Sequence, residues 1–436
     1  MKTKSSLNAL FLIVLMEITG IINAQDFTVG DLNYSVNDDG VSVTLISPAN
    51  PNGATGELII PESVTYNGFD YPVTKIGNYA FYYCNGLIGD LTLPNSVTDI
   101  GMNAFLCCTG FDGSLNISNS TTIIGYGAFY GCNGFTGSLI IPNSVITIDD
   151  FAFAFCHGFN DELIIGDSVS YIGNSAFVGC YGFTGDLVIP NSVTTIGDMA
   201  FSNCYGFTGS LILSNSVAII GEEAFGVCYG FTGDLIIPNS VTSIKNGAFG
   251  SCSGFTGSLI IGDYVNDIGD YAFGECTGFT GSLILGHSLT TIGDQAFYRC
   301  IEFTEVISLA SEPPTLLYEA FLIICKTITV PCGCISAYEN SDWSQYFDTF
   351  IEDCSSVSEF DENSVSLYPN PTSGSINIEA EYIQSVSIYS MLGEKMFENA
   401  VNGDSFNYDF SGNEKGVYLI RIETPEGVAT KKVTVR

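Results

Sequence analysis

The sequence predicts a β-rich solenoid of eleven stacked 24-residue coils with a parallel sheet, followed by a small C-terminal β-sandwich. Ala-Phe recurs at every 24th residue from 80–81 to 320–321, without an insertion or a deletion. A fixed period of this length indicates identical stacked units rather than a globule with one pocket. Residues 331–354 break the period, and after Cys354 short alternating apolar segments separated by glycine predict the sandwich. A cysteine follows Ala-Phe in register ten times, at 84, 108, 132, 156, 180, 204, 228, 252, 276 and 300.

Each repeat is predicted to be a coil that contains one short strand. In residues 186–209, Leu187 and Ile189 alternate with Val188, which predicts a strand with Val188 facing outward. Val193 and Ile196 are spaced for a tight turn that points both side chains inward. The other residues predicted to pack inward are Ala200, Phe201, Cys204 and Phe207.

Glycines mark the bends of the repeat. Gly206 and Gly209 are expected to supply turn conformations that a β-carbon disfavours. The glycine after the turn isoleucine is replaced by Asp149 in one copy and by Lys245 in another. Because lysine tolerates positive φ poorly, this position is not expected to be left-handed in every coil.

A single coil buries too little to offset the entropy of ordering its backbone, so the stack needs neighbours and caps. The N-terminal cap is expected to contain a hairpin that turns at 37–40, and the C-terminal cap holds the only tryptophan, Trp343. The predicted order is a signal peptide (1–24), an N-terminal β cap (25–54), the solenoid (55–325), a C-terminal cap (326–354), a linker (355–365) and the C-terminal domain (366–436).

The N-terminus has the pattern of an export signal. Lys2 and Lys4 precede an apolar run over 10–16, and Ile22-Asn23-Ala24 is a candidate cleavage site before Gln25. The apolar run is too short to span a membrane, and we expect no transmembrane segment. The mature protein is therefore expected to leave the cytoplasm.

The composition excludes some partners. The chain has 12 Lys and Arg against 47 Asp and Glu, a formal charge of −35. Such a chain repels nucleic acid and anionic lipid, so neither is an expected partner. Hydrophobic residues make up 46% of the chain, which is enough to build a core.

The ten cysteines in register have three interpretations. They can be buried free thiols, disulfides between adjacent coils, or metal ligands; the last is disfavoured by only two histidines and no Cys-x-x-Cys in the ladder. Four further cysteines surround the C-terminal cap and could form two bridges in an exported protein, with three pairings open. These are Cys325, Cys332, Cys334 and Cys354.

The sequence predicts no enzyme, cofactor or metal site. His157 and His287 occupy variable turn positions of the repeat, and Gly286-His287-Ser288-Leu289-Thr290 lacks the second glycine of a nucleophile elbow. Carboxylates are scattered over turns without the spacing of a calcium loop, although incidental calcium binding by surface acids stays an alternative.

The predicted binding surface is the outward column of the strands. It is flanked by polar residues, and such an apolar stripe marks an interaction site; the alternatives are plain neighbour packing of β-branched residues and self-association. The column consists of Ile140, Ile164, Val188, Ile212, Ile236, Ile260 and Ile284. A short aromatic column, which keeps a carbohydrate-binding role open, consists of Tyr181, Tyr205 and Tyr229.

The repeat resembles the leucine-rich repeats of the BspA type over about residues 55–325. The resemblance rests on the Ile-Pro, Val-x-x-Ile-Gly-x-x-Ala-Phe and Cys pattern of each copy. It implies a leucine-rich repeat solenoid that acts as a surface adhesin, with protein ligands such as fibronectin or fibrinogen. The residues themselves do not name a ligand.

The C-terminal segment resembles the sorting domain that Bacteroidetes-type bacteria use for type IX secretion. The matching motifs within 366–436 are Tyr368-Pro369-Asn370-Pro371, Met391-Leu392-Gly393, Gly416-Val417-Tyr418-Leu419-Ile420-Arg421 and Lys431-Lys432-Val433. Its predicted strands are 375–378, 386–389, 417–422 and 428–435. The resemblance implies contact with the secretion machinery and passage across the outer membrane, with removal of the domain on anchoring or release as an open alternative.

Together these features predict a non-catalytic adhesin, secreted or on the cell surface of a Gram-negative bacterium. It would bind a protein or another macromolecule of the host, the matrix or neighbouring cells. The alternatives are a structural or self-associating surface-layer protein and a carbohydrate-binding accessory module.

Overall fold

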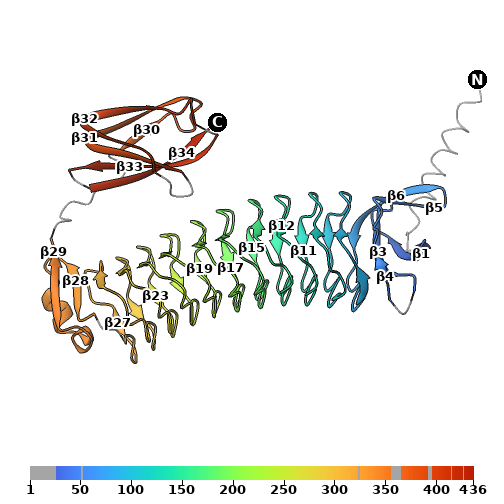
Figure 1. Cartoon of the computed structure of the whole chain (residues 1–436), viewed down its shortest axis with the longest axis horizontal. Coiled ribbons are helices and arrows are strands. Elements are labelled where there is room, and N and C mark those ends of the chain that lie inside the picture. The colour runs from blue at the N-terminus through green and yellow to red at the C-terminus, as the bar shows by residue number, and fades with distance from the viewer. Residues whose placement is uncertain are drawn as a thin grey trace, which may run out of the picture. The chain divides into compact units, whose positions relative to one another are not determined.

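The structure is a computed structural model that describes residues 26–50, 53–322, 325–354, 365–390, 395–413, 415–425 and 427–436. The predicted signal peptide and nearly all of the predicted linker lie outside the described residues. The chain divides into two compact units, one up to Glu352 and one from Asp353. The first unit is a solenoid of stacked β-coils (Figure 1) and the second is an antiparallel β-sheet, so the predicted fold class is confirmed.

One strand from each coil joins a continuous parallel ladder within a 15-stranded sheet. The sequence predicts only a tight turn here, but Thr195–Ile196 is strand β17, and Ile196 pairs in register with Ile172 and Ile220. Val193 and Ile196 both point into the core, as expected. The coil strands of this sheet are β6 (Phe69–Ile76), β9 (Asp99–Ile100), β11 (Ile123–Ile124), β13 (Thr147–Ile148), β15 (Tyr171–Ile172), β17, β19 (Ile219–Ile220), β21 (Ser243–Ile244), β23 (Asp267–Ile268), β25 (Thr291–Ile292) and β27 (Thr315–Leu316).

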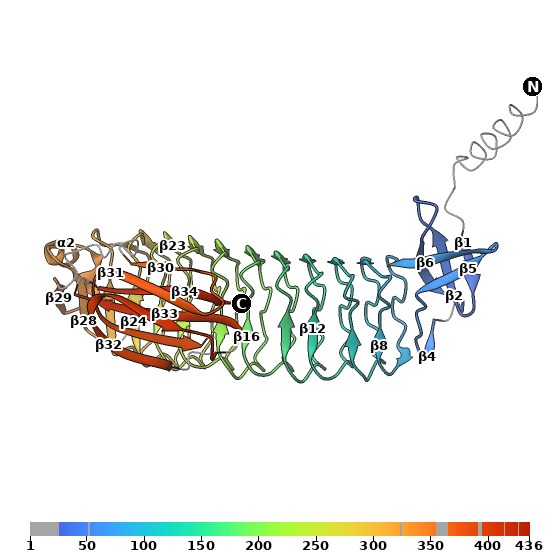
Figure 2. The ribbon, with the colours of Figure 1, turned by 90° about the horizontal axis from the view of Figure 1, so that it is seen from above.

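The strand that the sequence predicts forms a second ladder, which is visible along the solenoid in Figure 2. It is divided into shorter parallel sheets rather than one continuous sheet. Its members are β8 (Leu91–Thr92), β10 (Leu115–Asn116), β12 (Leu139–Ile141), β14 (Leu163–Ile165), β16 (Leu187–Val188), β18 (Leu211–Ile212), β20 (Leu235–Ile236), β22 (Leu259–Ile260), β24 (Ser282–Leu285) and β26 (Glu305–Ser308). In the C-terminal cap β28 (Thr327–Pro331) and β29 (Thr349–Asp353) extend the last of these sheets, and β4 (Thr55–Glu57) and β7 (Gly86–Ile88) form a separate parallel pair.

The third side of each coil carries Ala-Phe and is made of turns, which we call the Ala-Phe side. Adjacent coils are still joined there by backbone hydrogen bonds, such as Phe177 N–H to the Ala200 carbonyl at 2.8 Å. In each coil whose turns are fully described, two residues four apart have a left-handed backbone, for example Met199 (φ 55°) and Asn203 (φ 60°). A non-glycine residue in this conformation costs roughly 1–2 kcal/mol.

Gly206 and Gly209 are required for space rather than for backbone conformation. Neither has a positive φ, so the prediction of disfavoured turn conformations is wrong. A β-carbon at Gly206 would lie 2.1 Å from the carbonyl oxygen of Tyr181 in the preceding coil, well inside van der Waals contact. The same approach, at 2.0–2.2 Å, recurs at Gly110, Gly134, Gly158, Gly182, Gly230, Gly254 and Gly278.

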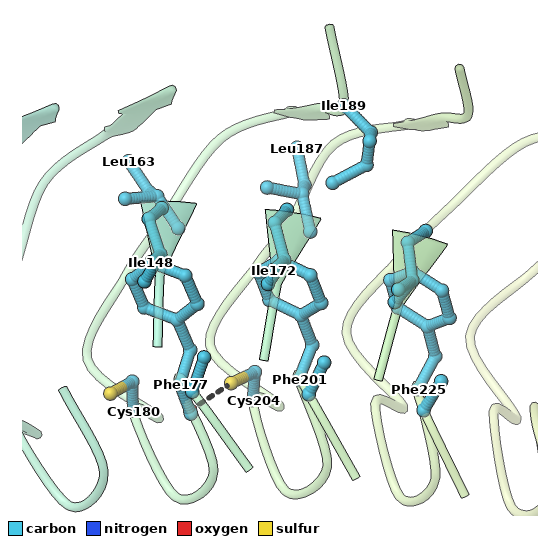
Figure 3. Packing of buried hydrophobic residues seen from close by; sticks show 14 of the residues in the cluster. Ile148, Leu163, Ile172, Phe177, Cys180, Leu187, Ile189, Phe201, Cys204 and Phe225 are labelled. Atoms are coloured by element: carbon cyan, nitrogen blue, oxygen red, sulfur yellow. Dashed lines mark hydrogen bonds between the residues drawn. The ribbon is translucent and has the colours of Figure 1, made fainter. Parts of the chain in front are cut away.

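Two columns of phenylalanine fill the core. The rings of Phe177, Phe201 and Phe225 lie parallel, with centroids 5.2 and 5.4 Å apart (Figure 3). A second column, to which Phe183 and Phe207 belong, stacks in the same way at 5.9 Å for that pair. Each fully buried ring contributes up to about 3 kcal/mol, but only because the next coil covers it.

The cysteine ladder consists of buried free thiols, the first of the three interpretations. Each thiol from Cys108 onward donates to a phenylalanine carbonyl of the preceding coil, as Cys204 Sγ does to Phe177 O at 3.0 Å (Figure 3). Phe177 O also accepts the backbone N–H of Cys180. Burial raises the pKa of most ladder thiols, that of Cys204 well above its ordinary value, so they stay protonated.

Caps cover both ends of the solenoid. At the N-terminal end the antiparallel strands β1 (Asp26–Val29), β2 (Leu32–Val36) and β3 (Val43–Pro48) lead into β6, to which β5 (Ser63–Tyr66) pairs. The C-terminal cap contains α2 (Ile335–Glu339) and the 3₁₀ helix η1 (Asp342–Gln345). Trp343 is fully buried, lies 5.4 Å from the Phe321 ring and donates from Nε1 to Pro314 O at 2.7 Å, so it covers the last ring of the column.

The second unit is a five-stranded antiparallel sheet. Two predicted strands, 375–378 and 386–389, are joined in one long strand, and the sequence analysis did not predict β30 or β32. Asn370 donates to Lys432 O at 2.6 Å and accepts from Thr434 N–H at 3.0 Å, so the Tyr-Pro-Asn-Pro motif holds the last strand. The strands are β30 (Ser366–Tyr368), β31 (Ser375–Ser390), β32 (Lys395–Asp409), β33 (Gly416–Thr424) and β34 (Gly427–Val435).

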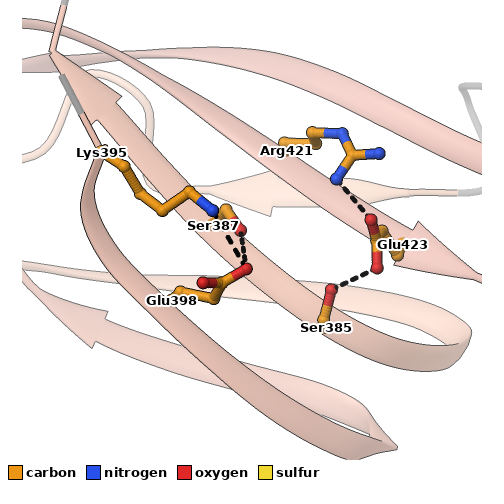
Figure 4. A network of polar contacts seen from close by, with 6 residues as sticks. All are labelled: Ser385, Ser387, Lys395, Glu398, Arg421 and Glu423. Atoms are coloured by element: carbon orange, nitrogen blue, oxygen red, sulfur yellow. Dashed lines mark hydrogen bonds and ion pairs between the residues drawn. The ribbon is translucent and has the colours of Figure 1, made fainter. Parts of the chain in front are cut away.

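Polar pairs fix the register on one surface of this sheet (Figure 4). Ser385 on β31 donates to Glu423 Oε2 on β33 at 2.7 Å, and Arg421 pairs with the other oxygen of Glu423. Lys395 and Glu398 form a second ion pair at 3.2 Å. The hydrogen bond from Ser385, more than the charge of Arg421, holds the pKa of Glu423 below its usual value.

We predict that Gly206→Ala lowers the free energy of unfolding by about 1–3 kcal/mol, because the new β-carbon overlaps a backbone carbonyl that cannot move away alone. Gly226→Ala is the control, since its β-carbon would meet nothing closer than 3.3 Å. Urea unfolding measures both variants. Equal stabilities would contradict the steric role of Gly206.

We also predict that the solenoid loses stability above pH 9. The unfolded thiols ionise near their ordinary pKa of 9.0, whereas burial raises the pKa of the native thiols, so stability is full below pH 9 and falls above it. Each thiol contributes about 1.4 kcal/mol per pH unit there. Unfolding free energies at several pH values should therefore fall less steeply for Cys204→Ala than for the wild type, a comparison that cancels tyrosine and lysine ionisation. Identical slopes would refute the prediction.

Candidate binding surface

The predicted apolar column lies on the outer surface of the second ladder. We call it the isoleucine column, with the seven residues Ile140, Ile164, Val188, Ile212, Ile236, Ile260 and Ile284. The first five side chains are exposed, for example Ile236 at 54% and Ile212 at 45%, and Ile260 and Ile284 are half-buried. On either side of each exposed residue the strand neighbours, such as Leu235 and Ile237, are buried.

Strand pairing places the members of the column directly beside one another. Ile140 is paired with Ile164, Val188 with Ile212, and Ile236 with Ile260. Parallel strands lie about 4.8 Å apart, so paired members of the column are close neighbours. The column is thus an apolar ridge on the outer surface of the ladder.

Polar residues on both sides of the ridge are already engaged in hydrogen bonds. On one side Asp186 Oδ1 accepts the backbone N–H of Ser210 at 2.7 Å, and Asp234 Oδ1 accepts that of Ser258 at 2.7 Å. On the other side Asn191 Oδ1 accepts the N–H of Asn215 at 2.9 Å. The polar rim that the sequence suggested therefore satisfies backbone donors of the next coil.

The tyrosine column forms a stack with one extra member. Tyr181, Tyr205 and Tyr229 lie with ring centroids 5.1 and 5.0 Å apart and planes within 6°, and His157 stacks on Tyr181 at 4.7 Å. Because each inner ring covers the faces of its neighbours, the column offers ring edges and hydroxyls to solvent. A sugar platform needs open ring faces, and this column leaves them open only at its ends.

The cysteines of the C-terminal cap form one bridge rather than two. Cys332 and Cys354 are disulfide-bonded, and Cys325 and Cys334 are free thiols. Glu352 is the third member of the group of possible metal ligands found in the described residues, but the two bonded sulfurs have no thiolate to offer.

The two histidines lie apart from each other in the stack. His287 Nδ1 pairs with Asp263 Oδ1 at 2.7 Å on the exposed turn, and His157 belongs to the aromatic stack. Both positions are those of ordinary repeat turns.

The structure also contains an exposed aromatic surface that the sequence analysis missed. It lies on the Ala-Phe side of the first four coils, and we call it the aromatic patch. The signal was present in the sequence, because aromatic residues recur at the positions directly before Ala-Phe and before the ladder cysteine. The patch consists of Tyr79, Tyr82, Tyr83, Met102, Tyr126, Tyr130, Phe151 and Phe155.

Family models match both units of the chain. The BspA type leucine rich repeat region matches in six copies over residues 74–208 and 255–341, which together exceed half of the chain. A secretion system C-terminal sorting domain matches residues 366–436. A comparison with curated proteins finds no match.

Solved structures are similar to this chain, and the first of them, with a TM-score above 0.5, shares its fold. A leucine-rich repeat protein from Bacteroides ovatus is 22% identical, with a TM-score of 0.52, and the match covers 76% of this chain and 77% of that one. A leucine rich cell surface protein from Faecalibacterium prausnitzii is 24% identical over 76% of this chain and 95% of that chain, with a TM-score of 0.46. Within the described residues, no helix has the length and apolar character needed to cross a membrane.

Proposed function

Because the chain belongs to the BspA type leucine-rich repeat family and carries a sorting domain, we propose that it is a non-catalytic adhesin, exported to the cell surface or beyond. The sorting domain implies handling by the secretion machinery. The solenoid binds a protein or another macromolecule of the host, the matrix or neighbouring cells. The isoleucine column is the surface that makes this contact.

The observation that carries the proposal is the exposure of five consecutive β-branched side chains on a rigid ladder. A row of this kind presents apolar area without any ordering of loops, so little entropy is lost when a partner covers it. Contiguous exposed apolar surface is typical of protein interaction sites. A ridge along several coils suits a macromolecule better than a small ligand, which needs a concave pocket.

Two alternatives receive less support. The stacked tyrosines have most of their ring faces covered, which weakens carbohydrate binding at that column. Self-association through the isoleucine column would bring together two chains that each carry a formal charge of −35, and their repulsion opposes it.

We predict that Ile212→Asp combined with Ile236→Asp weakens binding to immobilised fibronectin, fibrinogen or whole cells at least about tenfold, because each substitution places a charge in the contact. Surface plasmon resonance and a cell-binding assay measure the effect. Sedimentation of the same protein reports any change in self-association.

The matched control is Ile219→Asp, which adds a charge at a side chain of nearly equal exposure, 46%, on the other ladder. It should bind like the wild type. If the column variant keeps both its binding and its oligomeric state, the isoleucine column is not the contact surface.

We further predict that a chain lacking residues 366–436 accumulates in the periplasm of the producing bacterium, while its solenoid keeps its melting temperature because the two units are separate compact bodies. Cell fractionation and protease accessibility follow its location. The full-length column variant serves as the control and should still reach the surface. Normal display of the truncated chain would refute the sorting role.

A further inference from the structure

We propose that the aromatic patch is a second interaction surface and that it binds a basic segment of a partner protein, with arginine and lysine side chains lying over its tyrosine rings. It is on the Ala-Phe side, whereas the isoleucine column is on the second ladder. The inference goes beyond the proposed adhesion through that column and does not depend on it.

Side-chain contacts join the patch within two pairs of neighbouring coils. Within the first coil Tyr82 contacts both Tyr79 and Tyr83, with ring centroids 5.7 and 4.5 Å apart. Tyr79 Oη approaches Met102 Sδ of the second coil at 3.5 Å. The third and fourth coils are joined by contacts of Tyr126 with Phe151 and of Tyr130 with Phe155, at 5.5 and 5.4 Å.

Most of the aromatic side chains of the patch are exposed, and Tyr130 and Phe151 are half-buried. Tyr79 is 51% exposed, Tyr83 53% and Phe155 44%, although large aromatic side chains usually contribute by being buried. The Phe155 ring lies over Gly179 of the next coil, where a β-carbon would be 2.7 Å from its Cδ1. The missing side chain at Gly179 makes the room for this ring.

The backbone gives an independent reason to regard the patch as functional. Four of its members occupy the two left-handed positions of the coil: Tyr79 (φ 59°), Tyr83 (φ 57°), Phe151 (φ 57°) and Phe155 (φ 59°). Glycine, which adopts this conformation without strain, is found at these positions only at Gly127, Gly131, Gly179 and Gly247 among the described residues. Most other coils have polar residues there, such as Asn203 and Glu223, and Tyr271 is the one further aromatic residue. Tyr79, Tyr83 and Phe155 combine this strained backbone with a large exposed ring, so burial does not explain them.

Ring orientation distinguishes the patch from the stacked tyrosine column. Tyr79 and Tyr83 are inclined to Tyr82 by 69° and 70°, and Tyr130 is inclined to Phe155 by 72°. Inclined rings leave faces uncovered, unlike the parallel rings of Tyr181 and Tyr205. An open aromatic face attracts a cation, and arginine more often than lysine.

Charge favours a basic partner. Over the Ala-Phe side of these four coils (78–83, 102–107, 126–131 and 150–155) the only charged residue is Asp150, and both of its oxygens accept hydrogen bonds from Asn174. The patch is therefore neutral and aromatic, as the centres of protein interfaces are. The chain as a whole has a formal charge of −35, which attracts basic proteins over longer distances. A contact between a cation and a tyrosine ring already occurs on the Ala-Phe side, where the Arg299 guanidinium lies 5.9 Å from the Tyr298 ring centroid. Arg299 and Tyr298 occupy the repeat positions of Tyr83 and Tyr82, respectively.

The left-handed backbone allows a test that separates binding from folding. Tyr79→Asn, Tyr83→Asn and Phe155→Gly together remove three rings without changing the charge, and asparagine and glycine tolerate the left-handed conformation. The melting temperature should therefore not fall. The full-length variant should bind a fluorescein-labelled nona-arginine peptide about tenfold to a hundredfold more weakly than the wild type at about 0.15 M salt, measured by fluorescence anisotropy.

The control is Met199→Asn, Val227→Gly and Tyr271→Asn, which changes the same two positions in coils outside the patch. This control should bind the peptide like the wild type. A loss of binding confined to the patch variant would then come from the patch and not from general attraction of the peptide to an acidic chain. Equal binding by the patch variant and the wild type would overturn the proposal. The proposal would also be overturned if the patch variant kept its peptide binding but lost the ability to bind neutral glycans or to form oligomers.

Discussion

The distance between adjacent coils is the constraint on which the rest of the solenoid depends. Backbone hydrogen bonds join the coils on all three sides, and at Gly206 the chain passes so close to the Tyr181 carbonyl that no β-carbon fits. The phenylalanine rings and the thiols must repeat at this same spacing, with Cys204 reaching the Phe177 carbonyl. These contacts favour coils of equal length, which accounts for the unbroken 24-residue spacing of Ala-Phe. Only at the C-terminal end does the second ladder shift, where Leu283 pairs with Val306, 23 residues on.

The same constraint turns each sequence position into a column. A side chain at a given position has its counterpart from the next coil within contact distance, inside or outside the core. Inside the core these include the columns of phenylalanine and of cysteine. Burial raises the pKa of most of the cysteine thiols, so they stay protonated. Outside, aspartate and asparagine columns such as Asp186 and Asn191 satisfy backbone donors of the next coil. The remaining outward columns are free to vary, and both proposed interaction surfaces are built from them.

The predictions succeeded where periodicity carries the information. The inward positions, the strand at Leu187 and the covering role of the segment around Trp343 follow from apolar spacing and from the end of the repeat. The strand at Thr195–Ile196 was missed because two residues are too few to show alternation. The prediction gave the wrong reason for Gly206. Glycine is required both by a left-handed turn and by a close approach between coils, and the sequence does not distinguish these two causes.

The sequence by itself determined the architecture of this protein: a repeat that only stacking can bury, an outward column of β-branched residues, and a separate C-terminal domain. The tertiary structure alone decided which cysteines pair, because Cys332 meets Cys354 only after the cap has folded. It also decided the meaning of the exposed aromatic residues. Ring tilt and the sign of φ are properties of three-dimensional arrangement, so only the structure distinguishes the covered faces of Tyr205 from the open faces around Tyr83.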